Sequence, residues 1–362
     1  MKIAIDHQIL AIQDHGGISR YLSRLATELA GLGHQVRIIA PLHVNAYLPD
    51  LPPGLVTGWR IAPSRLARKL TRTVDGLLVP PLIGAFAPDI VIESYYATHR
   101  TSWGKARVVL PVHDMIHELY PQMFAADDPT IARKAAAVAR ADHIICVSEN
   151  TRADLIRFHP QVAGKTSVVL HGFDVPAPLP PGPPPARPYL LFVGERGGHK
   201  NWAGLLAAYA GSPALRAAFD LVAVGGRGFT TAEATAIAAA GLADQVHRRD
   251  ASDLELQRLY AEAAAFLYPS LYEGFGIPPL EAMAAGTPVV TMAASAIPEV
   301  CGDAVAYAQP DDTESLRVAI ETVVFDPVRS AALVAAGRQR LQRFSWARCA
   351  SETAAVLERV AG

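Results

Sequence analysis

The segment YPSLYEGFGIPPLEAMAAGTPVV (268–290) contains the end of an apolar strand, a loop with two glycines and the start of a helix. Pro278 and Pro279 suit the first turn of a helix, where a missing N–H costs nothing. LEAMAA (280–285) continues that helix, and a second apolar strand follows. The order strand, loop, helix, strand is typical of one unit of a parallel α/β sheet.

The start of this helix predicts a binding site for an anion, because its N–H groups and the positive end of its dipole favour phosphate. Glu273 precedes the loop glycines, and Glu281 is expected in the first helical turn. Both carboxylates would then flank one anion pocket, where they could accept hydrogen bonds from sugar or ribose hydroxyls. For either glutamate alone, a purely structural role at a turn or a helix start remains the simpler interpretation.

Short apolar runs alternate with alanine-rich helical stretches along the whole chain. Continuous runs of this kind suit strands that are buried on both faces of a parallel sheet. ISRYLSRLATELAGLG (18–33) has the spacing of a helix that ends at glycine. The fold class predicted is α/β, with two doubly wound Rossmann-like domains facing a central cleft that would hold the ligand. The predicted strands are 2–5, 36–40, 89–94, 107–112, 143–147, 167–170, 189–194, 221–225, 265–270 and 288–292.

The stretch PAPLPPGPPPARP (176–188) predicts the domain boundary, because eight of its thirteen residues are proline. Proline has a fixed φ and no N–H, so this stretch should be an extended linker rather than helix or central strand. We expect an N-terminal domain over 1–175, a C-terminal domain over 189–343 and a final helical segment over 344–362.

Composition excludes several classes of protein. With 362 residues, 51% of them hydrophobic, the chain is long and apolar enough for two folded domains rather than a disordered protein. No apolar run approaches the roughly 20 residues of a transmembrane helix. Asp6 and His7 interrupt the N-terminal apolar stretch, which argues against a signal peptide. Three widely spaced cysteines fit a reducing compartment, so a cytoplasmic protein is expected.

Charge is distributed unevenly along the chain. The net charge of −1 argues against nucleic acid as a partner. Residues 1–170 hold 18 Lys and Arg against 14 Asp and Glu, whereas residues 171–362 hold 15 against 20. Such an imbalance can reflect two different binding surfaces or ordinary variation between two domains.

The segment 259–303 resembles the signature of glycosyltransferase family 4. Glu273 and Glu281 match the Glu-x7-Glu motif of that family, and SAIPEV (295–300) matches the element that follows it. The resemblance implies the GT-B fold and a retaining, nucleotide-sugar-dependent transferase, with one of the final helices packing back on the N-domain. Further matching segments are HGGISRY (15–21), VHDMIHELYPQMF (112–124), VSENTRADL (147–155) and FSWARCA (344–350).

FVGERGGHKN (192–201) predicts the diphosphate-binding residues. Arg196 and Lys200 follow a strand, and two cations there could hold a diphosphate, the arginine in forked fashion and the lysine as a point charge. The resemblance assigns this role to Lys200 through its Lys-Asn dipeptide, although His199 stands where the family usually has arginine. The backbone N–H groups of Gly274, Phe275, Gly276 and Ile277 complete the predicted donor site.

The N-terminal half contributes further candidates. Gly16 and Gly17 precede the helix over 18–33 and would let a ligand approach the backbone closely, although a plain helix start explains them as well. His113 ends a strand and, by resemblance, lies near the donor sugar as a catalytic residue. Asp114 would orient His113 or contact the acceptor. Both side chains could also be purely structural.

The resemblance implies a donor, an acceptor and no metal. The expected donor is GDP-mannose, and the expected acceptor is a saccharide or lipid-linked saccharide in surface polysaccharide synthesis. No Asp-x-Asp motif is present, so the reaction is predicted to be metal-independent and without a cofactor. HRRD (247–250) departs from the family pattern, which leaves recognition of the base open.

Residues 60–78 form a basic amphipathic stretch with one acid, Asp75. It could lie on the anionic inner face of the cytoplasmic membrane, although a solvated helix face is the simpler interpretation. Its basic residues are Arg60, Arg65, Arg68, Lys69 and Arg72.

Two other functions remain open. A sugar-nucleotide 2-epimerase shares the two-domain fold but would need acid and base groups in patterns that this sequence lacks. A non-catalytic nucleotide-sugar-binding protein would have had no reason to keep both glutamates and both cations.

Overall fold

The computed structural model describes residues 1–362 apart from 99, 102–103, 178, 181 and 183–184, together with the side chain of Arg72. Four prolines of the predicted linker and the Arg72 side chain therefore lie outside the described structure. The chain divides into two compact units. Unit 1 comprises Met1–Gly172 and Phe344–Gly362, and unit 2 comprises Phe173–Arg343.

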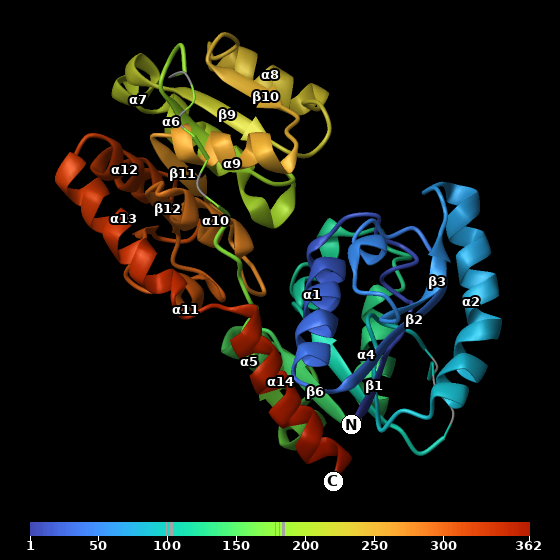
Figure 1. Ribbon diagram of the computed structural model, residues 1–362. Helices are drawn as coiled ribbons and strands as arrows, with labels where there is room; N and C mark the ends of the chain where they lie inside the picture. Colours follow the sequence, from blue (N-terminus) through green and yellow to red (C-terminus); the bar gives the residue numbers. More distant parts are fainter. Residues whose placement is uncertain (99, 102–103, 178, 181, 183–184) are drawn as a thin grey trace. The chain divides into compact units, whose positions relative to one another are not determined.

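Unit 1 contains a parallel sheet with the strand order β3-β2-β1-β4-β5-β6-β7 among the described residues (Figure 1). Its central strands are apolar runs such as KIAI and RVVLPV, and their residues are almost completely buried on both faces. The strands are β1 Lys2–Ile5, β2 Gln35–His43, β3 Val56–Arg60, β4 Ile90–Ile92, β5 Arg107–Val112, β6 His143–Cys146 and β7 Thr166–Val168.

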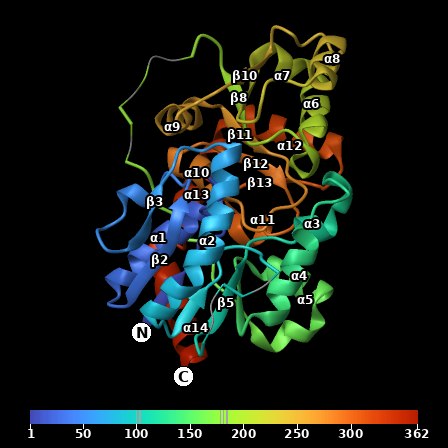
Figure 2. The ribbon, with the colours of Figure 1, turned by 90° about the vertical axis from the view of Figure 1, so that its right-hand side faces the viewer.

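Helices connect these strands and cover the sheet. The C-terminal helix α14 packs against α1, and Trp346 and Leu357 of α14 belong to the same apolar core as Leu22 and Leu25 of α1. Figure 2 shows α3 and α4 close together in this unit. The helices are α1 Gly17–Gly31, α2 Arg65–Phe86, α3 Ile116–Leu119, α4 Thr130–Arg140, α5 Glu149–Phe158 and α14 Trp346–Ala361.

Unit 2 contains a second parallel sheet with the order β10-β9-β8-β11-β12-β13 in its described part. Its strands are β8 Tyr189–Val193, β9 Asp220–Val224, β10 Val246–Arg249, β11 Ala265–Tyr268, β12 Val289–Met292 and β13 Ala306–Ala308. Its helices are α6 Trp202–Ala210, α7 Pro213–Ala218, α8 Thr231–Ala239, α9 Asp253–Glu262, α10 Ile277–Ala285, α11 Ile297–Cys301, α12 Thr313–Val324 and α13 Pro327–Leu341. Two parallel α/β units of this kind confirm the predicted fold class.

Helix α2 begins and ends later in the chain than the basic stretch 60–78 that the sequence analysis identified. The helix begins at Arg65, where the Ser64 side chain accepts a hydrogen bond from the Ala67 N–H, and it continues to Phe86. Arg60 belongs instead to strand β3, and its guanidinium pairs with Asp14. Asp75 is completely buried and accepts a hydrogen bond from the Leu42 N–H at 2.9 Å. Burial raises the pKa of this carboxyl to about 7. The one acid of the basic stretch therefore faces the sheet.

Candidate functional site

Lys200 and Glu273 form an ion pair in unit 2, with 2.6 Å between Nζ and Oε1. Lys200 ends the 3-10 turn Gly198–Lys200 that follows β8, and Glu273 lies in the loop that follows β11. Strands β8 and β11 are parallel neighbours, so their carboxyl ends meet at one edge of the sheet. Topology thus brings together two residues that are 73 positions apart in the sequence.

Tyr268 completes this cluster from the end of β11. Lys200 Nζ donates a hydrogen bond to the Tyr268 hydroxyl at 3.2 Å. Burial, with a further contribution from the Glu273 charge, raises the pKa of Tyr268 well above its ordinary value, so the hydroxyl stays protonated. The side chains of Lys200 and Glu273 are 18% and 14% exposed, which leaves the ion pair mostly shielded but reachable by a ligand.

The loop after Glu273 leads directly into α10. Gly276 precedes the helix with φ +110, a backbone conformation that favours glycine, and a Cβ there would come within 2.7 Å of Ile297 Cδ1. The Glu273 N–H donates to Ser295 Oγ at 2.8 Å, which fixes the loop at Glu273, before its glycines. Gly274, Phe275 and Ile277, the other predicted backbone donors, lie in this loop and at the first position of α10. The N-terminus of α10 therefore lies beside the ion pair.

Glu281 lies elsewhere than predicted. Helix α10 begins at Ile277, so Glu281 is its fifth residue and lies beyond the first turn, which the two prolines occupy. The Tyr260 hydroxyl donates to Glu281 Oε2 at 3.0 Å. Glu281 also lines a cavity of about 430 Å³ with residues of α9 and with Val175, Pro176, Leu179, Pro180 and Gly182. The two glutamates have separate partners in the structure, and the expectation that both flank one donor pocket stays a prediction.

Arg196 makes different contacts from those expected of a diphosphate ligand. Its Nε pairs with Glu233 Oε1 at 2.9 Å, and its side chain is only 5% exposed. The remaining guanidinium nitrogens donate to the carbonyls of Gly225, Arg227 and Gly228, which follow β9. Arg196 thus holds the loop 225–228, and its proposed contact with a donor stays a prediction.

Gly16 and Gly17 lie at the start of α1 in unit 1. Gly16 has an extended backbone, with φ 172, and a Cβ there would meet the Gln13 side chain at 2.4 Å, whereas a Cβ at Gly17 would meet nothing. Gln13 Oε1 accepts a hydrogen bond from the Ser19 N–H at 3.3 Å. Gln13 therefore occupies one backbone N–H group at the start of α1, and the approach of a ligand to Gly16 and Gly17 stays a prediction.

His113 and Asp114 follow β5 in unit 1. His113 is 9% exposed, and its Nε2 has no hydrogen-bond partner among the described residues. Burial lowers the pKa of His113 to about 4, so the imidazole is neutral at physiological pH. Asp114 Oδ1 accepts a hydrogen bond from the Ile116 N–H at 3.1 Å, which forms a tight turn just before the short helix α3.

Tyr268 and Tyr260, which contact the two glutamates, are missing from the sequence-based site. Tyr268 is the last residue of an apolar strand inside the family signature 259–303, and this position at a strand end is the signal that could have identified it. Tyr260 lies on α9, and its spacing from Glu281 carries no comparable signal.

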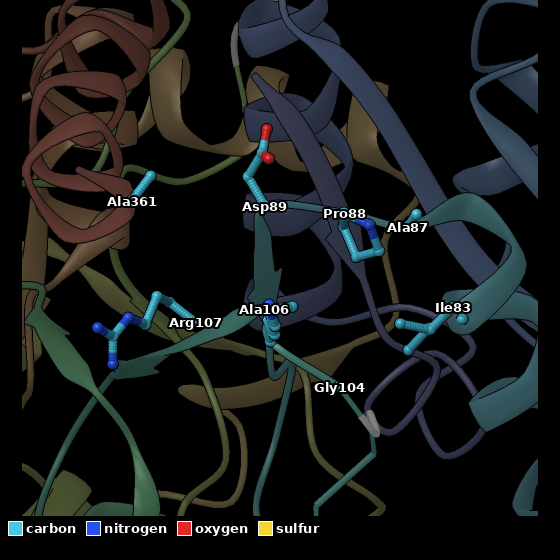
Figure 3. A pocket seen from close by; sticks show the side chains of 10 residues that line it. Ile83, Ala87, Pro88, Asp89, Gly104, Ala106, Arg107 and Ala361 are labelled. Atoms are coloured by element: carbon cyan, nitrogen blue, oxygen red, sulfur yellow. The ribbon is translucent and has the colours of Figure 1, made fainter.

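A different hollow of about 360 Å³ lies at the amino ends of β4 and β5 (Figure 3). Asp89 and Arg107 lie beside it, together with Ile83 of α2 and Ala361 of α14. Ligands of parallel α/β sheets bind beyond the carboxyl ends of the strands, so we do not assign this hollow to the reaction. Within the described residues, no group of three or more His, Cys, Asp or Glu side chains could hold a metal ion.

Two models of glycosyltransferase families match the chain. Residues 15–176 match the family model described as Glycosyltransferase Family 4, and residues 180–340 match the model described as Glycosyl transferases group 1. O-antigen chain mannosyltransferase B of Escherichia coli is 30% identical over 278 residues, which cover 72% of this chain and 71% of that protein.

Two solved structures share the fold over nearly the whole chain. Sucrose-phosphate synthase from Thermosynechococcus elongatus is 21% identical with a TM-score of 0.76, covering 99% of this chain and 98% of that one. Alr3699/HepE of Anabaena, solved with UDP and glucose, is 20% identical with a TM-score of 0.72, covering 99% and 100%. Together with the two matched models and the Glu-x7-Glu spacing, these similarities show that the chain belongs to glycosyltransferase family 4 and is a GT-B glycosyltransferase.

Proposed function

We propose that the enzyme transfers a hexose, in the first instance mannose from GDP-mannose, to a saccharide or lipid-linked saccharide acceptor with retention at the anomeric carbon. The observation that carries this proposal is the ion pair of Lys200 and Glu273 beside the N-terminus of α10. A cation, a helix N-terminus and a carboxylate match the diphosphate and the sugar hydroxyls of a nucleotide sugar. The choice of mannose is supported by the name of the Escherichia coli relative.

Each group has a role in this proposal. Lys200 and the backbone of residues 274–277 stabilise the negative charge that develops on the leaving diphosphate. Glu273 binds hydroxyls of the donor sugar, and Glu281 binds the ribose. The neutral imidazole of His113 forms a hydrogen bond with the sugar through Nε2. The reaction uses no metal, because the charge on the diphosphate is met by Lys200 and the helix dipole.

A donor screen followed by a turnover assay tests this proposal. The true donor should raise the free energy of unfolding by about 3 kcal/mol at a hundredfold excess over its Kd. The screen includes GDP-mannose and UDP-glucose, and turnover is measured with EDTA and with a lipid-linked saccharide acceptor. Turnover should survive EDTA. Loss of turnover that magnesium or manganese restores would contradict the metal-independent mechanism. Formation of an epimer from the donor alone would show that the enzyme is an epimerase and not a transferase.

We also propose that α2 contacts an anionic membrane surface. Four leucines of this helix are 46–76% exposed, and basic side chains lie between them. A helix that presents apolar and basic side chains together suits the boundary between acyl chains and anionic headgroups. No helix in the described part of the chain is long and apolar enough to cross a bilayer. The leucines are Leu66, Leu70, Leu77 and Leu78.

Vesicle binding checks this contact. Replacing Arg65, Arg68 and Lys69 with glutamine should weaken binding to anionic vesicles by about tenfold or more, since each basic residue near the surface contributes about 1 kcal/mol. The matched control replaces three exposed arginines of unit 2, Arg329, Arg338 and Arg343, which changes the net charge equally. Equal weakening by both triple variants would indicate a general charge effect and would refute the assignment to α2.

A further inference from the structure

Lys134 is a completely buried lysine in the middle of α4. Lysine is almost never fully buried without a partner. Its Nζ donates to Glu118 Oε2 at 2.8 Å and to the Asp114 carbonyl at 3.0 Å, and it lies 5.2 Å from the centroid of the Tyr96 ring. The ammonium thus joins α4 to the segment 114–118, which follows β5.

These contacts reach the backbone immediately after His113. The carbonyl that Lys134 binds belongs to Asp114, and the Tyr96 hydroxyl bonds to the His113 backbone. The His113 ring packs edge-on against Tyr21 at 5.2 Å between centroids. The imidazole is therefore fixed on several sides, while its Nε2 lacks a partner within the described structure.

We propose that Lys134 is a positioning residue for the transfer reaction, because its ammonium fixes the segment after β5 and so sets the direction and the charge of the His113 imidazole. The proposal rests on the proposed function, in which Nε2 of His113 bonds to the donor sugar. The proposal gives a function to the buried Lys134, which lies outside the short sequence motifs that resemble the family.

The charges around His113 support this assignment. Burial is the main cause that lowers the pKa of His113, Lys134 lowers it further, and Asp114 acts in the opposite direction. Without the Lys134 charge, the Asp114 carboxylate would act on the imidazole without an opposing cation. The titratable or charged groups that face the imidazole are Tyr21 of α1, Tyr96 after β4, Asp114 after β5, Lys134 of α4 and His171 after β7.

Titration of the His113 imidazole by NMR tests the proposal without reference to activity. The full chain is labelled at its 12 histidines, and the signal of His113 is assigned from a His113→Gln variant. In the wild type the signal should keep the neutral form between about pH 5 and 8, because burial lowers the pKa of His113 to about 4. In Lys134→Met its titration midpoint should rise, because a neighbouring cation that lowers the pKa of His113 has been removed.

Lys165 provides the matched control. Its Nζ binds the carbonyls of Val138, Ala139 and Ala141 at the C-terminal end of the same helix, and it makes no contact with the segment after β5 among the described interactions. Lys165→Met removes a cation and loosens α4 as Lys134→Met does. It should leave the His113 titration midpoint and kcat unchanged.

Turnover separates positioning from a purely structural role. Lys134→Met should lower kcat by about tenfold or more and move the acid limb of the kcat profile upward in pH, while the Kd of the nucleoside diphosphate, which binds unit 2, stays the same. Lys134→Arg should restore part of the lost kcat. If Lys134→Met does not fold, Lys134→Met with Glu118→Gln removes both charges of the buried pair and is measured in its place.

The outcomes are distinct. An unchanged His113 midpoint in Lys134→Met refutes the proposal, whatever the activity. A shifted midpoint without any change in kcat overturns the reaction role of Lys134 while leaving the electrostatic link intact. If the wild type shows no transfer with any donor, the proposed function fails, and the midpoint still decides the link between Lys134 and His113.

Discussion

Lys200→Met should lower kcat by about 100-fold or more, because it removes the positive charge nearest to the proposed diphosphate in the transition state. The substitution keeps most of the apolar stem and removes only the ammonium group. It leaves Glu273 without its ion-pair partner, so a double variant with Glu273→Gln is measured beside it. If the two residues act as one unit, the double variant should lose little more activity than the more damaging single variant.

Arg227 supplies a matched control for this experiment. It is an exposed cation in the loop after β9, the strand next to β8, and the structure assigns it no ion pair among the described residues. Arg227→Met removes the same charge from a neighbouring loop and should change kcat by no more than about twofold. If Lys200→Met turned over like the wild type, or if Arg227→Met were equally damaging, Lys200 would not be the diphosphate ligand.

The central strands of both sheets could be predicted because each is a run of apolar residues bounded by turn residues. Strand β5 spans the predicted residues 107–112, and β1 spans 2–5. The three strands that the prediction missed are β3, β10 and β13, at the edges of the sheets. Edge strands bury less side-chain area, so VTGWR and VHRR need no continuous apolar run.

The candidate site could be predicted only where sequence motifs mark it. Lys200 and Glu273 follow strands that proved to be neighbours, and the alternation of strands and helices already placed both residues at carboxyl ends. The partner of Arg196 depends on its rotamer and on a loop about 30 residues away. The burial of Lys134 depends on the packing of α4 against the segment after β5, which no local pattern indicates.

Glu273 and Glu281 share one sequence motif but face different partners. Glu273 pairs with Lys200 in front of the N-terminus of α10, whereas Glu281 accepts a hydrogen bond from Tyr260 and lines the cavity beside α9. In the proposed function Glu273 binds hydroxyls of the donor sugar close to the phosphates, which its carboxylate repels, whereas Glu281 binds the ribose hydroxyls beside the cavity. The two residues should therefore contribute to different steps of the reaction.

Glu273→Gln should lower kcat by about 100-fold while leaving the affinity for the free nucleoside diphosphate intact or slightly higher, because Lys200 then bonds the phosphates without a competing carboxylate. Glu281→Gln should instead weaken that affinity by about 1–3 kcal/mol, the loss expected for charged hydrogen bonds to a ribose. Calorimetry with the nucleoside diphosphate and a turnover assay measure both effects. Tyr260→Phe and Tyr268→Phe are the matched controls. Each removes only the tyrosine hydroxyl beside one glutamate and keeps the carboxylate of that glutamate. Loss of product affinity in Glu273→Gln but not in Glu281→Gln would reverse the two roles, and two variants with wild-type affinity and rate would place the donor site elsewhere.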